Sequence, residues 1–103
     1  MKAVKNNYQI NYPTVADGTV AFTFSTDVAL GRFSFTFRWL NSEWNGWATL
    51  PTGEVRPFGC VPGCVDWTEF TDFGVVLDSQ LTALGLGDLV PSSTLYLLEW
   101  AVD

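Results

Sequence analysis

The sequence predicts an all-β fold, a small antiparallel barrel or sandwich built from hairpins, with at most one short helix. Over residues 31–40, aromatic and polar side chains alternate with a period of two, the repeat of a β-strand. Similar apolar stretches recur at intervals of about eight to twelve residues, separated by turn-forming residues. With 103 residues, the chain is expected to form one β domain, residues 1–103, around a single core.

The segment 31–40 is the best-defined predicted strand. Its aromatic residues share one parity: Phe33, Phe35, Phe37 and Trp39. Because successive strand residues point to opposite faces, these rings lie on one face, and Arg32 and Arg38 lie on the other. A helix would distribute the rings around its axis. We therefore expect the aromatic face of 33–39 to be buried in the core.

The other predicted strands are shorter. They cover residues 8–12, 20–25, 47–50, 55–61 and 94–102. The turn after residue 40 is expected to involve residues 41–43 and Asn45-Gly46, both of which favour turns. Pro57 and Gly59 favour an edge position or a bulge for the strand that contains them. Residues 1–19 form an N-terminal segment that can extend as an arm.

Two segments lack a clear strand pattern. Residues 62–79 contain aromatic residues spaced by three, which favours a helix, but Gly74 and several threonines favour an irregular packed loop with some extended backbone. We expect the loop. Residues 78–87 are expected to form one or two helical turns, with Asp78 as the N-cap and Gly85 at the end.

The charge distribution excludes some partners. The net charge is −6, and no basic residue follows Arg56. Such a chain repels phosphate groups, so we expect neither nucleic-acid nor membrane binding. Charged residues make up only 16% of the sequence and hydrophobic residues 48%. Part of the surface is therefore apolar, which favours coverage by a partner over the alternative that a small β domain simply exposes some aromatic rings.

The first residues lack the apolar run of a signal peptide, so we expect synthesis in a cytoplasm. The only two cysteines, Cys60 and Cys64, flank a Pro-Gly turn and could close a short disulfide. In a reducing compartment, two buried thiols are favoured. A structural zinc site needs about four ligands, and the chain has no histidine, so we expect no metal and no cofactor.

No arrangement of residues indicates catalysis. The commonest general base, histidine, is absent, and neither cysteine has an obvious basic neighbour to activate its thiol. Glu43 and Glu54 could form a glycosidase pair, but carboxylates in turns are usually solvated. The glycines at 85 and 87 lack the longer pattern of a phosphate-binding loop. We therefore expect a protein that is not an enzyme.

Tryptophan side chains are candidates for binding. Trp44 and Trp47 flank the expected turn, so we expect them to be exposed, where they could contact a protein partner or stack on a sugar. A small carbohydrate-binding module that uses exposed tryptophans is therefore the alternative function. The terminal strand is almost continuously apolar, which predicts burial on both faces or against a partner. The candidate protein-interface residues are Trp44, Trp47, Arg32, Arg38, Leu95 and Leu97.

The order of features over residues 20–100 resembles a known family. An aromatic strand leads into a tryptophan-containing hairpin at 43–54, a strand and Pro-Gly turn follow at 55–63, and Leu-Gly precedes a leucine-rich terminal strand. This arrangement is similar to that of small structural virion proteins of tailed bacteriophages, from the tail and baseplate. The resemblance does not extend to the cysteine pair or to residues 65–79.

The resemblance implies a non-catalytic structural protein of the phage tail or baseplate, close to the tail hub. It implies virion assembly through contacts with other tail or baseplate proteins (hub, wedge or tube), in several symmetry-related copies. The protein would be made in the host cytoplasm and reside in the virion.

Overall fold

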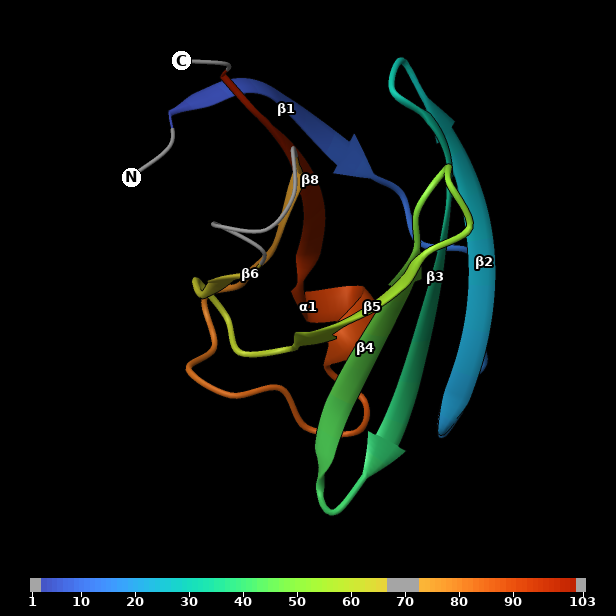
Figure 1. Ribbon diagram of the computed structural model, residues 1–103. Helices are drawn as coiled ribbons and strands as arrows, with labels where there is room; N and C mark the ends of the chain where they lie inside the picture. The colour runs from blue at the N-terminus through green and yellow to red at the C-terminus, as the bar shows by residue number, and fades with distance from the viewer. Residues whose placement is uncertain (1–2, 67–72, 102–103) are drawn as a thin grey trace.

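The computed structural model describes residues 3–66 and 73–101. They form two four-stranded antiparallel sheets that face each other, with one short helix at the lower end of β8 (Figure 1). Sheet A has the strand order β1-β8-β7-β6, and sheet B has the order β2-β3-β4-β5. The all-β prediction is confirmed in its sandwich form, because the two sheets stay separate and do not close into a barrel.

Short turns join the successive strands from β2 to β5, whereas longer segments, residues 11–20 and 79–88, link β1 to β2 and β7 to α1. Sheet A consists of β1 (Val4–Ile10), β8 (Thr94–Trp100), β7 (Phe73–Asp78) and β6 (Val65–Asp66). Sheet B consists of β2 (Ala21–Val28), β3 (Gly31–Leu40), β4 (Glu43–Thr49) and β5 (Val55–Gly59). The single helix in the described ranges is α1 (Leu89–Ser92).

Sheet B is a meander in which each strand pairs with the next. The β3–β4 hairpin turns over two residues, Asn41 and Ser42, whose φ angles are +53° and +62°. Positive φ at both positions is typical of the turn that matches the twist of paired strands. The prediction that Asn45-Gly46 also forms part of the turn is wrong. Both residues lie inside β4, and Asn45 pairs with Arg38 across the hairpin.

The core lies between the two sheets. From sheet B, the rings of Phe33, Phe35 and Phe37 are fully buried, which confirms the prediction for these three residues. Trp39, on the same face, is only half-buried because it lies near the end of the strand. The most deeply buried residues of sheet A are aliphatic, and Tyr8 and Phe73 pack beside them less completely buried. The aliphatic residues are Ile10, Val75, Leu77, Leu95 and Leu97.

Sheet A is built from the two ends of the chain. Strand β1 pairs along β8, so residues 4–10 belong to the sheet rather than to an extended arm. Strand β7 pairs with β8 on its other side. Residues 73–78 therefore form a central strand, and the prediction of an irregular loop is wrong there. The remainder of that segment, 67–72, lies outside the described residues.

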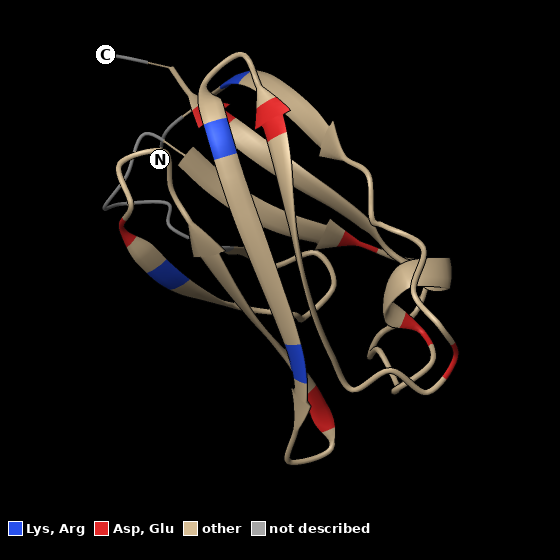
Figure 2. Ribbon diagram, turned by 90° about the vertical axis from the view of Figure 1, so that its right-hand side faces the viewer, with Lys and Arg blue, Asp and Glu red and all other residues tan. Residues whose placement is uncertain are grey.

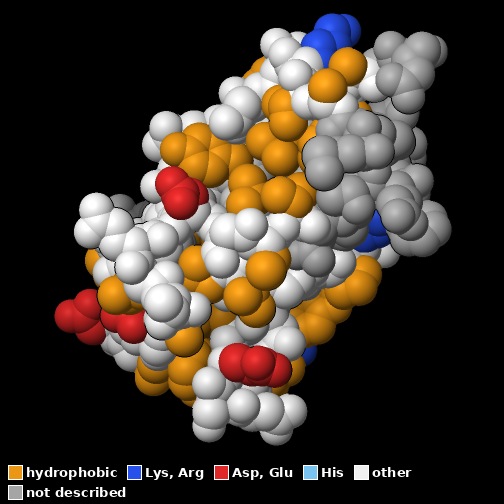
Figure 3. Space-filling model, turned by 90° about the vertical axis from the view of Figure 1, so that its left-hand side faces the viewer, with side chains coloured by type: hydrophobic (Ala, Val, Ile, Leu, Met, Phe, Trp, Pro, Cys, Tyr) orange, Lys and Arg blue, Asp and Glu red, His pale blue; other side chains and the backbone are white. Residues whose placement is uncertain are grey.

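On the outer side of sheet A, Gly74 explains why a glycine occurs in a central strand. A Cβ at this position would lie 2.3 Å from Cζ2 of Trp100, so the indole packs directly on the glycine backbone. Leu98 and Trp100 on this face are buried, as are Leu95 and Leu97 on the inner face. The terminal strand is thus buried on both faces, as predicted. Figure 3, viewed from this side, shows hydrophobic side chains gathered there.

The predicted helix at 78–87 is absent from its expected position. Asp78 ends β7, and α1 begins only at Leu89. Side chains compete for the backbone in this segment: the Ser79 hydroxyl accepts the Leu81 N–H at 3.1 Å, and the Asp88 carboxylate accepts the Gly85 N–H at 2.7 Å. Such local hydrogen bonds favour turns over a continuous helix.

The prediction of an edge position for the strand with Pro57 is confirmed, since β5 lies at the margin of sheet B. Cys60 follows it and is buried, whereas Cys64 is exposed in the turn before β6. No disulfide joins the two residues. The prediction of two buried thiols is therefore wrong for Cys64, because the Val61–Cys64 turn points its last residue into solvent.

Candidate functional site

The outer face of sheet B brings together one tryptophan and two arginines from the sequence-predicted interface. Trp47 in β4 lies opposite Thr36 in β3 and Pro57 in β5. Arg32 and Arg38 lie on the same face of β3, towards its two ends (Figure 2). We call this surface the outer face of sheet B. It is the candidate functional site.

Hydroxyl groups occupy the centre of this face beside the indole. Thr23 and Thr36 lie opposite each other in β2 and β3, with their hydroxyl oxygens 2.9 Å apart. Ser25 and Ser34 form a second cross-strand pair at 2.7 Å. Each pair uses one hydroxyl hydrogen internally, so each retains one hydrogen for another acceptor. The face therefore offers hydrogen bonds to a partner and is only partly engaged in contacts of its own.

The charges on the face are exposed. Arg32 forms an ion pair with Asp27 at 3.7 Å, and both side chains are more than two-thirds exposed. Such a pair contributes at most about 1 kcal/mol to stability. Arg38 lies between Ala21 and Asn45 in the register, and no carboxylate of the described chain lies within 4 Å of it. Its guanidinium is available to an acidic group from elsewhere.

Three sequence-predicted interface residues lie elsewhere. Trp44 is 6% exposed, because the two-residue turn places it opposite Trp39 on the inner face, where the rings meet edge to face. Its indole N–H donates to the Gly85 carbonyl oxygen at 2.9 Å. Leu95 and Leu97 are fully buried between the sheets. These three residues belong to the core of the described chain, so the prediction that Trp44 is exposed is wrong, and none of the three side chains is open to a partner here.

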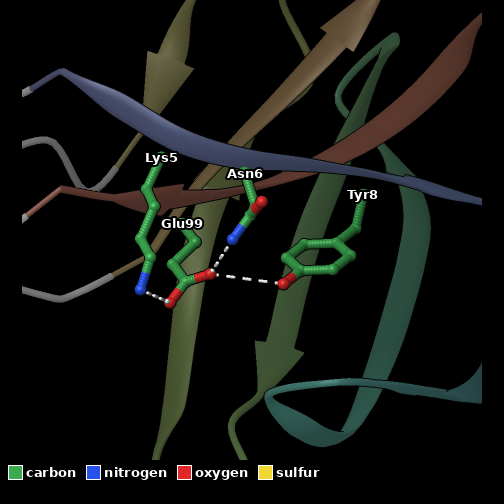
Figure 4. A network of polar contacts seen from close by, with 4 residues as sticks. All are labelled: Lys5, Asn6, Tyr8 and Glu99. Carbon is green, nitrogen blue, oxygen red and sulfur yellow. Dashed lines mark hydrogen bonds and ion pairs between the residues drawn. The ribbon is translucent and has the colours of Figure 1, made fainter.

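A polar cluster at the end of sheet A was missed by the sequence reasoning. Glu99 shares a face with Leu95 and Leu97 but lies near the end of β8. Figure 4 shows its carboxylate beside three side chains of β1. Its carboxylate accepts hydrogen bonds from Asn6 Nδ2 at 2.7 Å and from the Tyr8 hydroxyl at 3.2 Å. Lys5 Nζ lies 3.7 Å away. The sequence signal that could have indicated this cluster is Glu99 itself, a single carboxylate in an otherwise mostly apolar strand.

These contacts change the acidity of the cluster. The hydrogen bond from Asn6 is the main cause that lowers the pKa of Glu99 below its ordinary value, with a further contribution from Lys5. Burial, followed by the charge of Glu99, raises the pKa of Tyr8. Both carboxylate oxygens of Glu99 have partners from β1, so the cluster ties β1 to β8.

The residues considered for catalysis are not brought together. Glu43 begins β4, whereas Glu54 follows its other end and pairs with Arg56 at 2.8 Å. The two carboxylates therefore cannot act on one bond. Within residues 3–66 and 73–101, no group of three or more histidine, cysteine or acidic residues could hold a metal ion. No helix in the same ranges is long and apolar enough to cross a membrane.

In comparisons with known proteins, the chain matches no family model, no curated protein and no solved structure. Its function is therefore argued from the geometry and from the sequence resemblance.

Proposed function

We propose that this protein is a structural component of a phage tail or baseplate that works by binding other proteins through the outer face of sheet B. The observation that carries the proposal is the position of Trp47. It stands on an exposed sheet face with Arg32 and Arg38 at the two ends of the neighbouring strand. Tryptophan and arginine are the residue types most often found where interfaces gain their binding energy.

The remaining surface chemistry supports assembly over catalysis. The hydroxyl pairs Thr23–Thr36 and Ser25–Ser34 bond to each other and not to a general base that would activate a hydroxyl as a nucleophile. The two guanidinium groups favour an acidic patch on the partner. The partners implied by the resemblance are hub, wedge or tube proteins of the tail, with this chain present in several symmetry-related copies of the virion.

The experiment is a comparison of virion incorporation. Tail particles are purified from lysates of a phage that carries this gene, with either the wild-type chain, Trp47→Ala or Leu81→Ala. Leu81 is exposed and lies outside the face, so it is the matched control. We expect mass spectrometry to find the wild type and Leu81→Ala in the particles, and a loss of about tenfold or more for Trp47→Ala. Absence of the wild-type chain from the particles contradicts the proposal.

A second function, sugar binding, is favoured by one observation. Trp47 is half-buried on the outer face of sheet B opposite Thr36, and further hydroxyls lie alongside. An indole that stacks on a sugar ring with hydroxyls at its margin is a common arrangement for carbohydrate recognition. A glycan array distinguishes the two: binding by the wild type that is lost in Trp47→Ala, with the fold retained, favours the carbohydrate-binding module.

A further inference from the structure

We propose that strand β2 is a self-association edge, at which a second copy of this chain pairs antiparallel with β2 and extends sheet B. Strand β2 is hydrogen-bonded to β3 on one side only. Figure 2 shows it at the margin of the sheet. The inference deepens the proposed assembly function by identifying one partner, but it rests on a surface other than Trp47.

The four strand edges of the sandwich differ in how they are protected. Strand β5 is short and contains Pro57, and β6 has two residues. Strand β1 has a register irregularity between Val4 and Asn6, next to Lys5. Short length, proline, bulges and lysine are the usual means by which edge strands avoid pairing with other chains. Strand β2 has eight residues, a continuous register, no proline and no lysine, and its one charged residue, Asp27, lies near its end.

The hydrogen-bonding groups on this open edge can be assigned. The Trp39 N–H donates to the Val20 carbonyl at 2.8 Å, and Val20 is opposite Trp39 in the register. In an antiparallel ladder, hydrogen-bonded pairs alternate with non-bonded pairs. The even-numbered residues of β2 therefore bond to β3. The backbone N–H and C=O groups that point outward belong to Ala21, Thr23, Ser25 and Asp27.

These outward groups have no backbone partner within the part of the chain that the structure describes. The inner side chains of the same strand are also incompletely covered. Phe22 and Phe24 are only half-buried, whereas Phe35 and Phe37, directly opposite them in β3, are fully buried. A further strand beside β2 would satisfy the backbone and cover both rings.

A second copy fits because one antiparallel register satisfies hydrogen bonds and charge together. With Phe24 opposite Phe24 of the second copy, Thr23 pairs with the second Ser25 and Ala21 with the second Asp27. All outward groups then face outward groups. The two Asp27 residues lie at opposite ends of the interface, so no like charges meet.

The same register gives Arg38 an acidic partner. Arg38 lies beside Ala21 in the row across the sheet, and Ala21 would lie beside Asp27 of the second copy. That Asp27 keeps its exposed 3.7 Å pair with Arg32 of its own chain, so its carboxylate would lie between two guanidinium groups. With neighbouring strands about 4.8 Å apart, the two Cα atoms are about 10 Å apart, which a guanidinium and a carboxylate can span across the small alanine. Charge complementarity across the pair therefore favours a second copy over an unrelated strand.

The experiment measures self-association of the isolated full chain and amide exchange over a range of concentrations. We expect a reversible dimer in sedimentation analysis. The amides of Thr23, Ser25 and Asp27 should become protected as the concentration rises, whereas those of Phe22, Phe24 and Thr26 should be protected throughout by β3. Ser25→Pro, which removes one outward N–H, should abolish the dimer. Ser34→Ala, on the interior strand, is the matched control and should leave it unchanged.

A charge exchange keeps the proposal testable even if the proline variant does not fold. Arg38→Asp and Asp27→Arg should each weaken dimerisation by about tenfold, and the double variant should restore most of the loss. A chain that stays monomeric at millimolar concentration overturns the proposal. So does a dimer in which the outward amides remain unprotected, or one in which the double variant is no better than the singles. If these amides become protected only when an extended peptide from another tail protein is added, that peptide and not a second copy occupies the β2 edge, and the proposal is overturned. Virion incorporation of Trp47→Ala tests the outer face of sheet B, and with it the proposed function, independently of the β2 edge.

Discussion

The ring of Phe58 lies directly over the backbone of Gly46. A Cβ on Gly46 would come within 2.4 Å of both Cε2 and Cζ of that ring, and the two residues are opposite each other in β4 and β5. The glycine is therefore required for packing rather than for a turn. It allows a phenylalanine from the edge strand to pack against Phe37 in the core, with the ring centroids 5.6 Å apart.

The first prediction follows from this contact. Gly46→Ala should destabilise the fold by about 1–3 kcal/mol, because the methyl group forces Phe58 or the strand to move. Gly59→Ala is the matched control: it lies in the neighbouring strand with no atom within 4 Å of its Cβ position. Thermal or urea unfolding measures both. Equal midpoints for the two variants would mean that Phe58 can turn aside without cost.

Phe35 provides the second prediction. Its side chain is fully buried between the sheets, in contact with Phe24 and Phe58. Phe35→Ala should cost about 3–5 kcal/mol, since the cavity adds to the lost transfer free energy. Val55→Ala, at a position 59% exposed, should change the free energy of unfolding little. An unchanged unfolding midpoint for Phe35→Ala would place the stabilising core elsewhere.

The sequence predicted those elements whose pattern is local. The strict alternation from Phe33 to Phe37 determines which face is buried without knowledge of any neighbour, because strand geometry alone imposes the period of two. The edge position of the strand with Pro57 also followed from local chemistry, since proline lacks the N–H that a central strand needs.

The location of Trp44 could not be predicted, because two turn signals competed. A turn at Asn41-Ser42 places Trp44 opposite Trp39 on the inner face, whereas a turn that includes Asn45-Gly46 does not. In the folded chain, Gly46 lies inside β4 because the ring of Phe58 occupies the space beside it. That contact is between strands, and the local sequence around the turn does not contain it.

Strand β7 was missed for a similar reason. A glycine in a short apolar segment favours a loop in a local reading, but Gly74 is needed because Trp100 packs on it. The two residues meet only after β7 pairs with β8, and the intervening residues hold α1.

Part of the candidate site could be predicted from the sequence. Arg32, Arg38 and Trp47 share a face because the register between β3 and β4 brings them together.

The third prediction concerns acid stability. Because the folded state lowers the pKa of Glu99, chiefly through the hydrogen bond from Asn6, this carboxylate stabilises the fold above the ordinary glutamate pKa of 4.5. That contribution is lost as the pH falls through the lower folded-state pKa. Glu99→Gln should therefore be less stable than wild type at pH 7, and the difference between the two should shrink as the solution is acidified below pH 4.5.

The measurement is urea unfolding of both proteins at a series of pH values. Glu43→Gln is the matched control, because Glu43 is exposed at the β3–β4 turn and forms no ion pair within the described chain. A difference between wild type and Glu99→Gln that stays constant from pH 7 to pH 2 would show that the charge of Glu99 does not contribute.

Tyr12 gives the fourth prediction, at the opposite end of the pH scale. Its ring lies between the sheets, with centroids 6.1 Å from Phe24 and 5.9 Å from Phe37, and its hydroxyl lies 2.8 Å from that of Ser93. Burial is the main cause that raises the pKa of Tyr12 well above 10. The neutral phenol is thus favoured in the folded state. Its contribution to stability is fully present below pH 10 and is lost progressively as the pH rises above it.

Tyr12→Phe separates this ionisation from the rest of the alkaline response. The phenylalanine loses the hydrogen bond to Ser93, so the variant should be about 1 kcal/mol less stable than wild type at pH 7. Between pH 10 and pH 12 the wild type should lose stability faster than the variant, because unfolding releases a proton from Tyr12 and the phenylalanine has none to release. Urea unfolding across this range, with tyrosinate absorbance as a second readout, measures both effects. Parallel stability curves for the two proteins above pH 10 would mean that Tyr12 ionises as readily in the folded chain as in the unfolded one.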